Sequence, residues 1–282
     1  MIQIRRSKLV PIMPHPLRTA LRGIRDNIHD ALFRSKYIYR LYLWSKCRSN
    51  GPKGLPKATW SNAVLKNHQE WQNAVKQLRT LELPPANSLP KNWDGLAALS
   101  AILTSTDLEA KILDAGAARY SVILPWLFLY GYRNLIGINP IFQRSFKRGP
   151  IRYECGDITQ TSFENDTFDV ITCMSVIEHG VNLDLYFKEV SRILKPKGLL
   201  ITSTDYYCDP INTQDLIAYG VPIHIFCRDE ISSALNIAMN YGLEMTGKID
   251  LECQEKPVRW EQYDLDYTFL VFTLQKKCSD VV

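Results

Sequence analysis

Residues 111–118 read Lys-Ile-Leu-Asp-Ala-Gly-Ala-Ala, and this octapeptide decides the expected fold. Residues 111–113 suit a buried strand of a parallel sheet, and Asp114 ends that strand. Gly116 then allows the backbone to turn sharply and to approach a ligand closely. Because ligands of open α/β sheets bind beside the carboxyl ends of the strands, the octapeptide predicts a binding turn.

The glycine pattern of this turn disfavours a dinucleotide. A pyrophosphate-binding loop carries three glycines as G-x-G-x-x-G, whereas Ala118 and Ser121 stand where the second and third would fall. A carboxylate at Asp114 instead favours a cofactor with a positively charged amino-acid portion and no phosphates. The turn resembles the first motif of class I S-adenosylmethionine-dependent methyltransferases. This resemblance implies S-adenosyl-L-methionine as the cofactor, with Asp114, Ala115 and Gly116 beside its methionine portion.

The remaining chain alternates strands and helices in the order that such an enzyme needs. Four more strands are expected after the first, at residues 134–138, 151–155, 168–174 and 199–203. Two last strands, near 245–251 and 267–274, have no helix between them. The pattern predicts an α/β fold with a doubly wound, mostly parallel seven-stranded sheet and an antiparallel edge pair. We expect residues 93–282 to form this domain and residues 1–92 to form a basic helical N-terminal extension and linker.

Helix signals agree with this order. Asn182 is the expected N-cap of the helix after the fourth strand, and Ser121 that of the helix after the first. Pro125 is tolerated near the start of the latter helix, because early amides have no intrahelical partner. A helix at residues 93–102 is expected to cover the pocket, and another is expected at about 61–80.

The resemblance also assigns roles to residues at other strand ends. Asn139 stands where the family usually has an acid that grips both ribose hydroxyls, and an amide can still make one such contact. Asp157 matches the acid that accepts a hydrogen bond from the adenine amino group, with Ile158 against the ring. Met174 and Ser175 match the segment that lines both cofactor and acceptor.

These residues also fit structural roles, which stay open at this point. Asp114 can cap the helix that follows it, and Asp157 can close a turn. Asn139 and the proline after it can begin a short helix. His179, at a strand-to-helix junction, can be a cap or a packed ring.

The expected reaction is methyl transfer to an oxygen of a small molecule or saccharide by in-line displacement. A neutral imidazole can accept the hydroxyl proton, so His179 is the first candidate for the base. Asp205, in the loop expected just beyond the fifth strand, is the second. Tyr206, Tyr207 and His224 are expected to contribute to the acceptor pocket. Two alternatives remain: an RNA-modifying methyltransferase that uses a basic N-terminal arm, and a non-catalytic methyltransferase-like binding module.

Positive charge is concentrated at the start of the chain. Residues 1–60 hold 13 basic and 2 acidic residues, whereas the remainder holds 21 basic and 27 acidic residues. Apolar residues recur there at helical spacing, and arginines lie largely off that stripe; the stripe comprises Leu17, Leu21, Ile24, Ile28, Leu32, Tyr39 and Tyr42. The pattern fits a lid packed on the domain, a peripheral contact with an anionic membrane, or a cleaved targeting peptide. Nucleic acid is disfavoured, because no recognition motif accompanies the charge.

Composition bounds the remaining classes. The 282 residues, of which 46% are hydrophobic, suffice for one sizeable core and an extension. No apolar run approaches the roughly 18 residues that span a bilayer. Seven scattered cysteines and five histidines show no metal-ligand spacing, so we expect no metal site and no disulfide framework. These features favour a cytoplasmic protein that can associate peripherally with the membrane.

Overall fold

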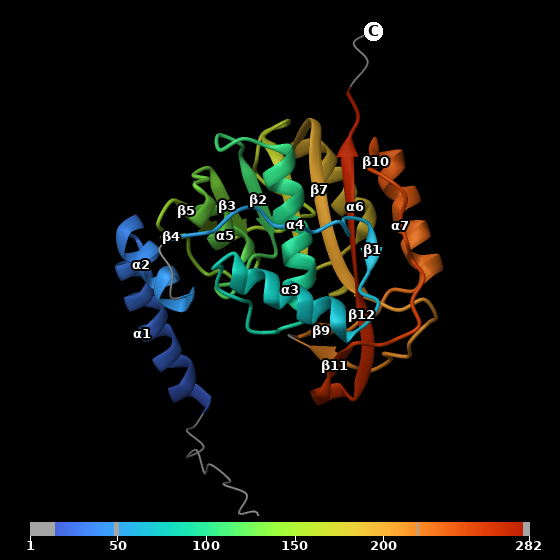
Figure 1. Cartoon of the computed structure of the whole chain (residues 1–282), viewed down its shortest axis with the longest axis horizontal. Coiled ribbons are helices and arrows are strands. Elements are labelled where there is room, and N and C mark those ends of the chain that lie inside the picture. Colours follow the sequence, from blue (N-terminus) through green and yellow to red (C-terminus); the bar gives the residue numbers. More distant parts are fainter. Residues whose placement is uncertain (1–14, 48–50, 219, 279–282) are drawn as a thin grey trace, which may run out of the picture.

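The computed structural model describes residues 15–47, 51–218 and 220–278, and it is built around one large sheet (Figure 1). Five parallel strands form its centre, in the order β5 (Ile151–Glu154), β3 (Leu135–Ile138), β2 (Ile112–Ala115), β6 (Phe168–Met174) and β7 (Leu194–Tyr206). Every residue of β2 and β3 is buried, as expected for strands covered on both faces. The chain runs outward from β2 through β3 and from β6 through β7, so a topological switch point lies between β2 and β6.

Antiparallel strands complete the sheet at both ends. The strands that flank the parallel centre are β4 (Phe146–Arg148) beside β5 and β12 (Leu265–Lys276) beside β7. Three short strands also pair with β12, namely β1 (Ala63–Val64), β10 (Leu243–Met245) and β11 (Val258–Trp260). The predicted mostly parallel sheet and the antiparallel pair of its last two strands are confirmed, and three further strands bring the sheet to ten.

Helices cover both faces of the sheet. One hydrophobic cluster contains residues of α3 (His68–Thr80), α4 (Lys91–Ser105) and α5 (Ile123–Tyr130), and a second contains residues of α6 (Leu183–Ile193) and α7 (Arg228–Asn240). The Asn182 side chain caps α6 by accepting from the Leu185 amide at 3.1 Å, as predicted. Ser121 does not cap α5 as predicted, because its hydroxyl accepts from the Ala118 amide within the preceding turn.

The predicted limits of one strand and the predicted start of one helix were wrong, because contacts between distant segments set them. Strand β7 begins at Leu194 and continues through Tyr206. Its second part, from Leu199 to Tyr206, pairs with β12, and Thr268 lies opposite Tyr206. Asp205 therefore lies within the strand and not in a loop beyond it. The helix expected at about 61–80 begins only at His68, where Asn67 caps it, and a short β-strand precedes it.

The contacts of residues 51–90 join them to the sheet and its helices. Strand β1 pairs with β12, and α3 packs on α4. The domain boundary at residue 92 stays a prediction. A short two-stranded hairpin, β8 (Ile217–Ala218) with β9 (Val221–Pro222), and a 3₁₀ turn at Glu261–Tyr263 complete the elements of the described chain. No helix of the described residues has both the length and the apolar content needed to cross a bilayer.

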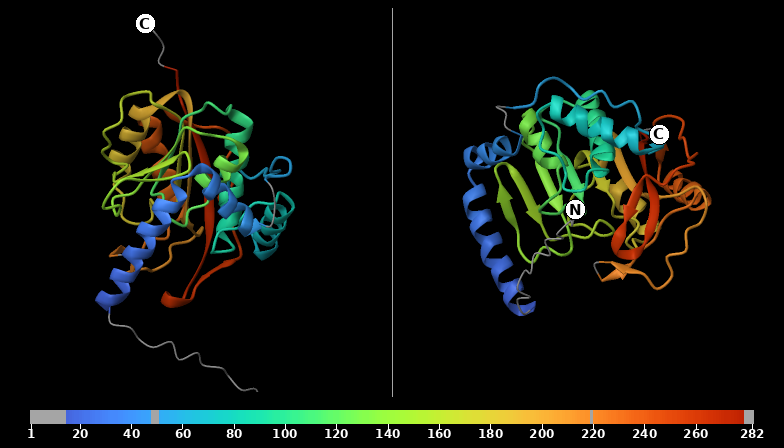
Figure 2. Two further views of the ribbon diagram at one scale, coloured as in Figure 1. Left: turned by 90° about the vertical axis from the view of Figure 1, so that its left-hand side faces the viewer. Right: turned by 60° about the horizontal axis from the view of Figure 1, so that its bottom comes forward.

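Two N-terminal helices, α1 (His15–Phe33) and α2 (Lys36–Cys47), lie at the β4 edge of the sheet and are here called the arm (Figure 2). Asp30 and Phe33 are buried against the body, and Tyr39 is buried as the stripe predicted. The stripe residues Ile24, Ile28 and Leu32, in contrast, are exposed. A lid that packs this part of the stripe on the domain is therefore contradicted, because the opposite face of α1 makes the contact; Leu17 and Leu21 lie outside the described side chains.

Candidate active site

A cavity of about 510 Å³ opens at the carboxyl ends of β2, β6 and β7. Its other walls come from α4, from the loop before α4 and from β11 and β12. Ligand sites of open α/β sheets occur at this place, beside the switch point. Of the sequence-predicted site residues, six line the cavity, namely Asp114, Gly116, Met174, Ser175, His179 and Asp205.

The turn after β2 presents a buried carboxyl group and a glycine that tolerates no side chain. Asp114 is 3% exposed and accepts a hydrogen bond from the Thr172 hydroxyl at 2.8 Å. Burial raises the pKa of the Asp114 carboxyl to about 7, and the Thr172 hydrogen bond opposes that rise. Gly116 has φ +78°, and a Cβ atom there would lie 2.2 Å from Val176 Cγ2. Ala115 is buried within β2, outside the cavity lining.

The turn after β6 brings Met174, Ser175, Glu178 and His179 to the cavity. Ser175 has φ +55°, a left-handed conformation that is strained for a residue with a side chain and is concentrated at functional sites. Glu178 is 1% exposed and accepts from the Thr204 hydroxyl at 3.1 Å. The turn is tight, since the His179 amide donates to the Val176 carbonyl at 3.0 Å.

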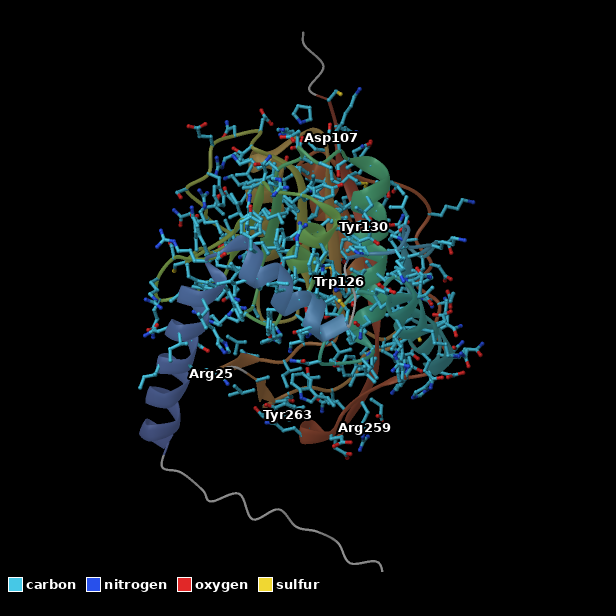
Figure 3. All side chains as sticks on the ribbon, turned by 60° about the vertical axis from the view of Figure 1, so that its left-hand side comes forward. Arg25, Asp107, Trp126, Tyr130, Arg259 and Tyr263 are labelled. Carbon is cyan, nitrogen blue, oxygen red and sulfur yellow. The ribbon has the colours of Figure 1, made fainter. Side chains whose placement is uncertain are left out.

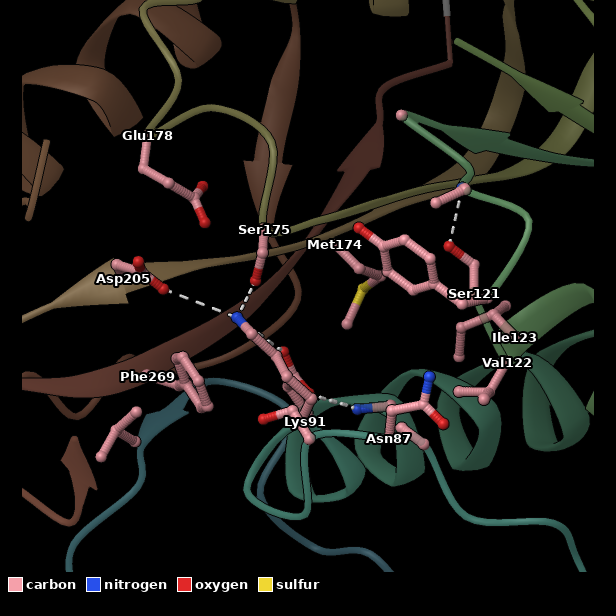
Figure 4. Close-up of a pocket in the computed structure, with 18 of the residues that line it drawn as sticks. Asn87, Lys91, Ser121, Val122, Ile123, Met174, Ser175, Glu178, Asp205 and Phe269 are labelled. Carbon is pink, nitrogen blue, oxygen red and sulfur yellow. Dashed lines mark hydrogen bonds and ion pairs between the residues drawn. The ribbon is translucent and has the colours of Figure 1, made fainter. Parts of the chain in front are cut away.

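Lys91, on the first turn of α4, reaches into the middle of these groups (Figure 4). Its ammonium donates to the Ser175 hydroxyl and lies 3.5 Å from Asp205 Oδ1 and 4.0 Å from Asp94 Oδ2. The same Nζ atom lies 3.5 Å from the centre of the Phe269 ring, a cation–π arrangement. Lys91 therefore links three elements of the wall, and it was missed in the sequence because no motif marks it.

Burial and mutual repulsion set the charge state of the cavity wall. Burial raises the pKa of Asp94 and of Asp205, and the Lys91 ammonium opposes both shifts. Burial and then the neighbouring Asp205 raise the pKa of Glu178. Burial lowers the pKa of His179, and Lys91 lowers it further, so the imidazole is neutral at pH 7. Each of these carboxyl groups gains from a cation brought into the cavity, because a nearby positive charge favours its ionised form.

Besides Ala115, three predicted cofactor residues lie outside the cavity lining, namely Asn139, Asp157 and Ile158. Asn139 donates to the carbonyl oxygens of Gly116 and Ala117, both at 3.1 Å, and its own side-chain oxygen accepts from the Ile141 amide. It thereby ties the end of β3 to the β2 turn. Asp157 accepts from the amide and hydroxyl of Thr159, each at 2.8 Å, and Ile158 is buried.

The three predicted acceptor residues also lie outside the cavity lining. Tyr206 is fully buried and donates to the Leu251 carbonyl at 2.8 Å, because successive side chains of β7 point to opposite faces and Asp205 takes the cavity side. The Tyr207 hydroxyl donates to the Gln254 carbonyl at 3.4 Å. His224 Nε2 lies 3.1 Å from Glu230 Oε1.

An aromatic wall faces the carboxyl groups and was missed in the sequence. Tyr267 and Phe269 are alternate residues of β12, and Phe269 lies opposite Asp205 in the β7–β12 ladder. Trp260 and Arg259 of β11 complete this side of the cavity. The alternating aromatics of residues 267–269 were a usable signal, but only the strand pairing shows which face they share.

Comparisons with known proteins agree with this architecture. Residues 113–202 match a family model described as a methyltransferase domain. The sterol 24-C-methyltransferase erg-4 of Neurospora crassa is 27% identical over 118 residues, which are 40% of this chain and 31% of that protein. The ubiquinone biosynthesis O-methyltransferase of Coxiella burnetii is 25% identical over 143 residues, 51% of this chain and 50% of that protein. The chain thus spans about a third to a half of the length of these relatives.

Among solved structures, an S-adenosylmethionine-dependent methyltransferase from Mesorhizobium loti superposes with a TM-score of 0.48 at 16% identity. It covers 66% of this chain and 98% of its own. The family model covers the last residues of β2 with Asp114, the Glu178-His179 turn and most of β7, so it falls on three of the elements that build the cavity. The part of the chain that builds these walls of the cavity therefore matches a methyltransferase domain, and it lies on a doubly wound sheet whose switch point is beside the cavity.

Proposed function

We propose that the cavity binds S-adenosylmethionine and that the protein transfers its methyl group to an oxygen of a small molecule or saccharide. The observation that carries this proposal is that Asp114 and the Glu178-His179 pair line one cavity at the switch point of the sheet. The cofactor brings an ammonium and a sulfonium, and buried carboxyl groups of raised pKa are suited to such cations. Residues 93–282 are proposed as the catalytic unit, with residues 1–92 as its extension.

For the cofactor, we propose that Asp114 holds the methionine ammonium while the Gly116 backbone, Met174 and Ser175 lie against the cofactor. Asn139 supports the turn through its bonds to Gly116 and Ala117, which leaves the second lone pair of its side-chain oxygen for a ribose hydroxyl. Asp157 is proposed to accept a hydrogen bond from the adenine amino group, and Ile158 to pack against the adenine ring.

For the chemistry, S-adenosylmethionine supplies a methyl group already activated by its sulfonium. As the new carbon–oxygen bond forms, the carbon–sulfur bond breaks, its electron pair stays on sulfur, and the hydroxyl proton must leave. His179 is the proposed base because its lowered pKa keeps it neutral and ready to accept a proton. Asp205 is the second candidate, although its ion pair with Lys91 must then loosen.

The acceptor is proposed to lie between the carboxyl groups and the aromatic wall of Trp260, Tyr267 and Phe269. Carboxylates accept hydrogen bonds from hydroxyl groups, and aromatic rings offer an apolar platform, so the two together suit a hydroxylated ring. Tyr206, Tyr207 and His224 are proposed to shape this region from behind, since their polar atoms bond to neighbouring backbone or side chains. One matched relative is named an O-methyltransferase, which supports oxygen, and another is named a C-methyltransferase.

Calorimetry of S-adenosylmethionine binding tests the first step. We expect binding by the wild-type protein, a loss of roughly ten- to a hundredfold in affinity for Asp114→Asn, and a smaller loss for Asp157→Ala. Glu244→Gln is the matched control, because Glu244 lies exposed on β10, outside the cavity lining. Equal affinity of wild type and Asp114→Asn would reject the proposed cofactor position, and a folded wild type that binds no cofactor would favour the non-catalytic module.

A panel of hydroxyl, amine and carbon acceptors, read by formation of S-adenosylhomocysteine, tests the second step. We expect turnover with hydroxyl acceptors and its loss in His179→Ala. If His179→Ala retains turnover while Asp205→Asn abolishes it, Asp205 is the base. Turnover with carbon acceptors alone would reject the oxygen assignment.

An RNA acceptor is the alternative that the basic arm favours. Binding of RNA that weakens steeply with salt and with loss of arm charges would support it. The four carboxyl groups of the cavity disfavour it, because a phosphate backbone would be repelled near the site of transfer.

A further inference from the structure

Helix α1 presents two different faces to its surroundings. On one face, Asp30 and Phe33 are buried against the body. On the other, Ile24, Ile28 and Leu32 recur every four residues and are 56%, 54% and 49% exposed. Residues four apart lie on the same side of a helix, so these three form one apolar stripe that points away from the sheet.

Specific contacts fix this orientation of α1. Asp30 Oδ1 accepts from Arg119 at 2.5 Å and lies 3.7 Å from Arg148, which is itself 7% exposed. The Gly149 amide donates to the Phe33 carbonyl at 2.7 Å. A roll of the helix that buried the stripe would break these contacts and leave the Arg148 guanidinium buried without its carboxylate, so the stripe is held toward solvent.

The rest of the outward surface of the arm is apolar and positively charged. Helix α2 exposes Tyr37, Ile38 and Leu41. The exposed basic side chains of the arm are Arg25, Arg34, Lys36 and Lys46, and Figure 3 shows Arg25 on α1 at the margin of the body. Its acids are Asp26 and Asp30, and both lie within 4 Å of Arg119 of the body. Asp26 also pairs with Arg25 at 3.3 Å, so Arg34, Lys36 and Lys46 carry most of the excess charge. The outward surface therefore combines exposed apolar side chains with an excess of positive charge.

We infer that this outward surface of the arm docks on an anionic membrane. The apolar stripe would enter the boundary between headgroups and acyl chains, and the basic side chains would contact the anionic headgroups. Charge complementarity selects this occupant. A second copy of the chain that docked through the same surface would bring like charges together, and an RNA backbone would leave the apolar stripe unused.

The position of the arm decides which edge of the molecule would meet the membrane. In Figure 1, α1 lies at the left-hand side of the molecule and runs toward its lower end, where β9 and β11 also lie. Strand β11 carries Arg259 and Trp260, which line the cavity. A membrane held by the outward surface of the arm would lie along the β4 edge of the sheet, at the opposite end of the strand order from β12, with which β11 pairs. The inference does not rest on the proposed reaction, because binding to vesicles is measured without cofactor or acceptor.

Co-sedimentation of the full chain with vesicles tests the inference. One set of vesicles contains phosphatidylcholine alone, and the other contains equal parts of phosphatidylcholine and phosphatidylglycerol. We expect the protein to sediment with the second set only, and the binding to weaken as salt is raised. Replacing Arg34→Gln and Lys36→Gln together should weaken binding by about fivefold per charge. The triple variant Ile24→Ser, Ile28→Ser, Leu32→Ser should weaken it by roughly tenfold or more.

The matched controls remove similar groups elsewhere on the surface. Leu185→Ser with Met239→Ser removes exposed apolar side chains of α6 and α7, and Lys188→Gln with Lys248→Gln removes exposed charges. Both controls should bind as the wild type does, and unchanged unfolding temperatures show that all variants fold. No sedimentation with anionic vesicles at low salt overturns the inference. Wild-type vesicle binding by the triple variant, or a dimer that the triple variant abolishes, also overturns it.

Discussion

The cavity and the outward surface of the arm are charged regions of opposite sign, and the protein holds their charges in different ways. In the cavity, Asp94, Asp114, Glu178 and Asp205 are at most 4% exposed, and burial raises the pKa of each. On the arm, the basic side chains are exposed to solvent; that of Arg25, for example, is 62% exposed. Buried charges are strongly coupled to their neighbours, whereas exposed charges are screened and act together. A single substitution should therefore have large effects in the cavity and small effects on the arm.

Gly116→Ala should have the largest effect. A Cβ atom at this position would meet Val176 Cγ2 at 2.2 Å, and φ +78° already disfavours any side chain. We expect a loss of about 2–5 kcal/mol in the free energy of unfolding and loss of cofactor binding. Gly242→Ala is the control, since Gly242 has φ +73° and nothing within 4 Å of its added Cβ. Chemical denaturation of both variants separates the clash from the backbone strain, and equal losses would show that the turn has room.

Asp114→Asn should show that burial of this carboxyl costs stability. The carboxyl has a pKa of about 7 when folded against 3.8 for the free group, so the folded protein binds more protons between these values. Stability contributed by Asp114 is therefore fully present below about pH 4 and is lost as the pH rises toward 7. We expect Asp114→Asn to be more stable than the wild type at pH 8, by up to about 4 kcal/mol, and equal to it at pH 4. Denaturation midpoints at the two values measure this, and a variant less stable at both would contradict it.

Affinity for S-adenosylmethionine should follow the same titration in the opposite sense. The cofactor ammonium binds the ionised carboxylate, so wild-type affinity should rise with pH through about 7. In Asp114→Asn this pH dependence should be absent. If replacement of Asp114 stabilises the protein and removes cofactor binding, the role of this residue is to bind the cofactor and not to stabilise the fold.

The sequence predicted the parts of the site that lie close together along the chain. Asp114 and Gly116 share one turn, and Glu178 and His179 share another, so a strand followed by polar residues revealed both. The central parallel strands were also predicted, because buried strands are continuous apolar runs in the sequence. The predicted limits of the strand Phe168–Met174 are the observed ones.

The features of the site that were not predicted depend on contacts between segments that are far apart in the sequence. Lys91 precedes the first strand of the motif and no signal marks it, yet its ammonium reaches Ser175 and Asp205. Asp205 was expected in a loop, and only the ladder with β12, where it lies opposite Phe269, extends the strand through it. The exposed stripe of α1 was similarly undecided, because helical spacing shows which residues share a face and not what covers it.

Lys91→Met should shift the pH dependence of turnover without abolishing the fold. The Lys91 ammonium lowers the pKa of His179, so its removal should move the acid limb of the kcat profile to higher pH. The pKa of Asp205 would rise as well, so the shift tests the electrostatics of the cavity and not the identity of the base. Lys188→Met, at an exposed position of α6, is the control and should leave the profile unchanged. A lower rate with an unshifted profile would mean that Lys91 acts through packing alone.

Asp30→Asn should have a small effect on the molecule as a whole, because the arm is attached at one edge. Asp30 is 8% exposed and contacts Arg119, Arg144 and Arg148, so its loss should weaken docking of the arm by about 2 kcal/mol. Hydrogen exchange in α1 should then quicken by roughly thirtyfold, while exchange in the sheet stays unchanged.

Asp26→Asn provides the matched comparison on the same helix. The Asp26 side chain is 29% exposed and lies 3.7 Å from Arg119, so solvent screens much of the interaction. We expect less than about a threefold change in exchange of α1. If both variants raised the rate of hydrogen exchange in α1 equally, burial would not explain why some charge pairs of this molecule are stronger than others. The contrast between cavity and arm would then rest on the number of contacts alone.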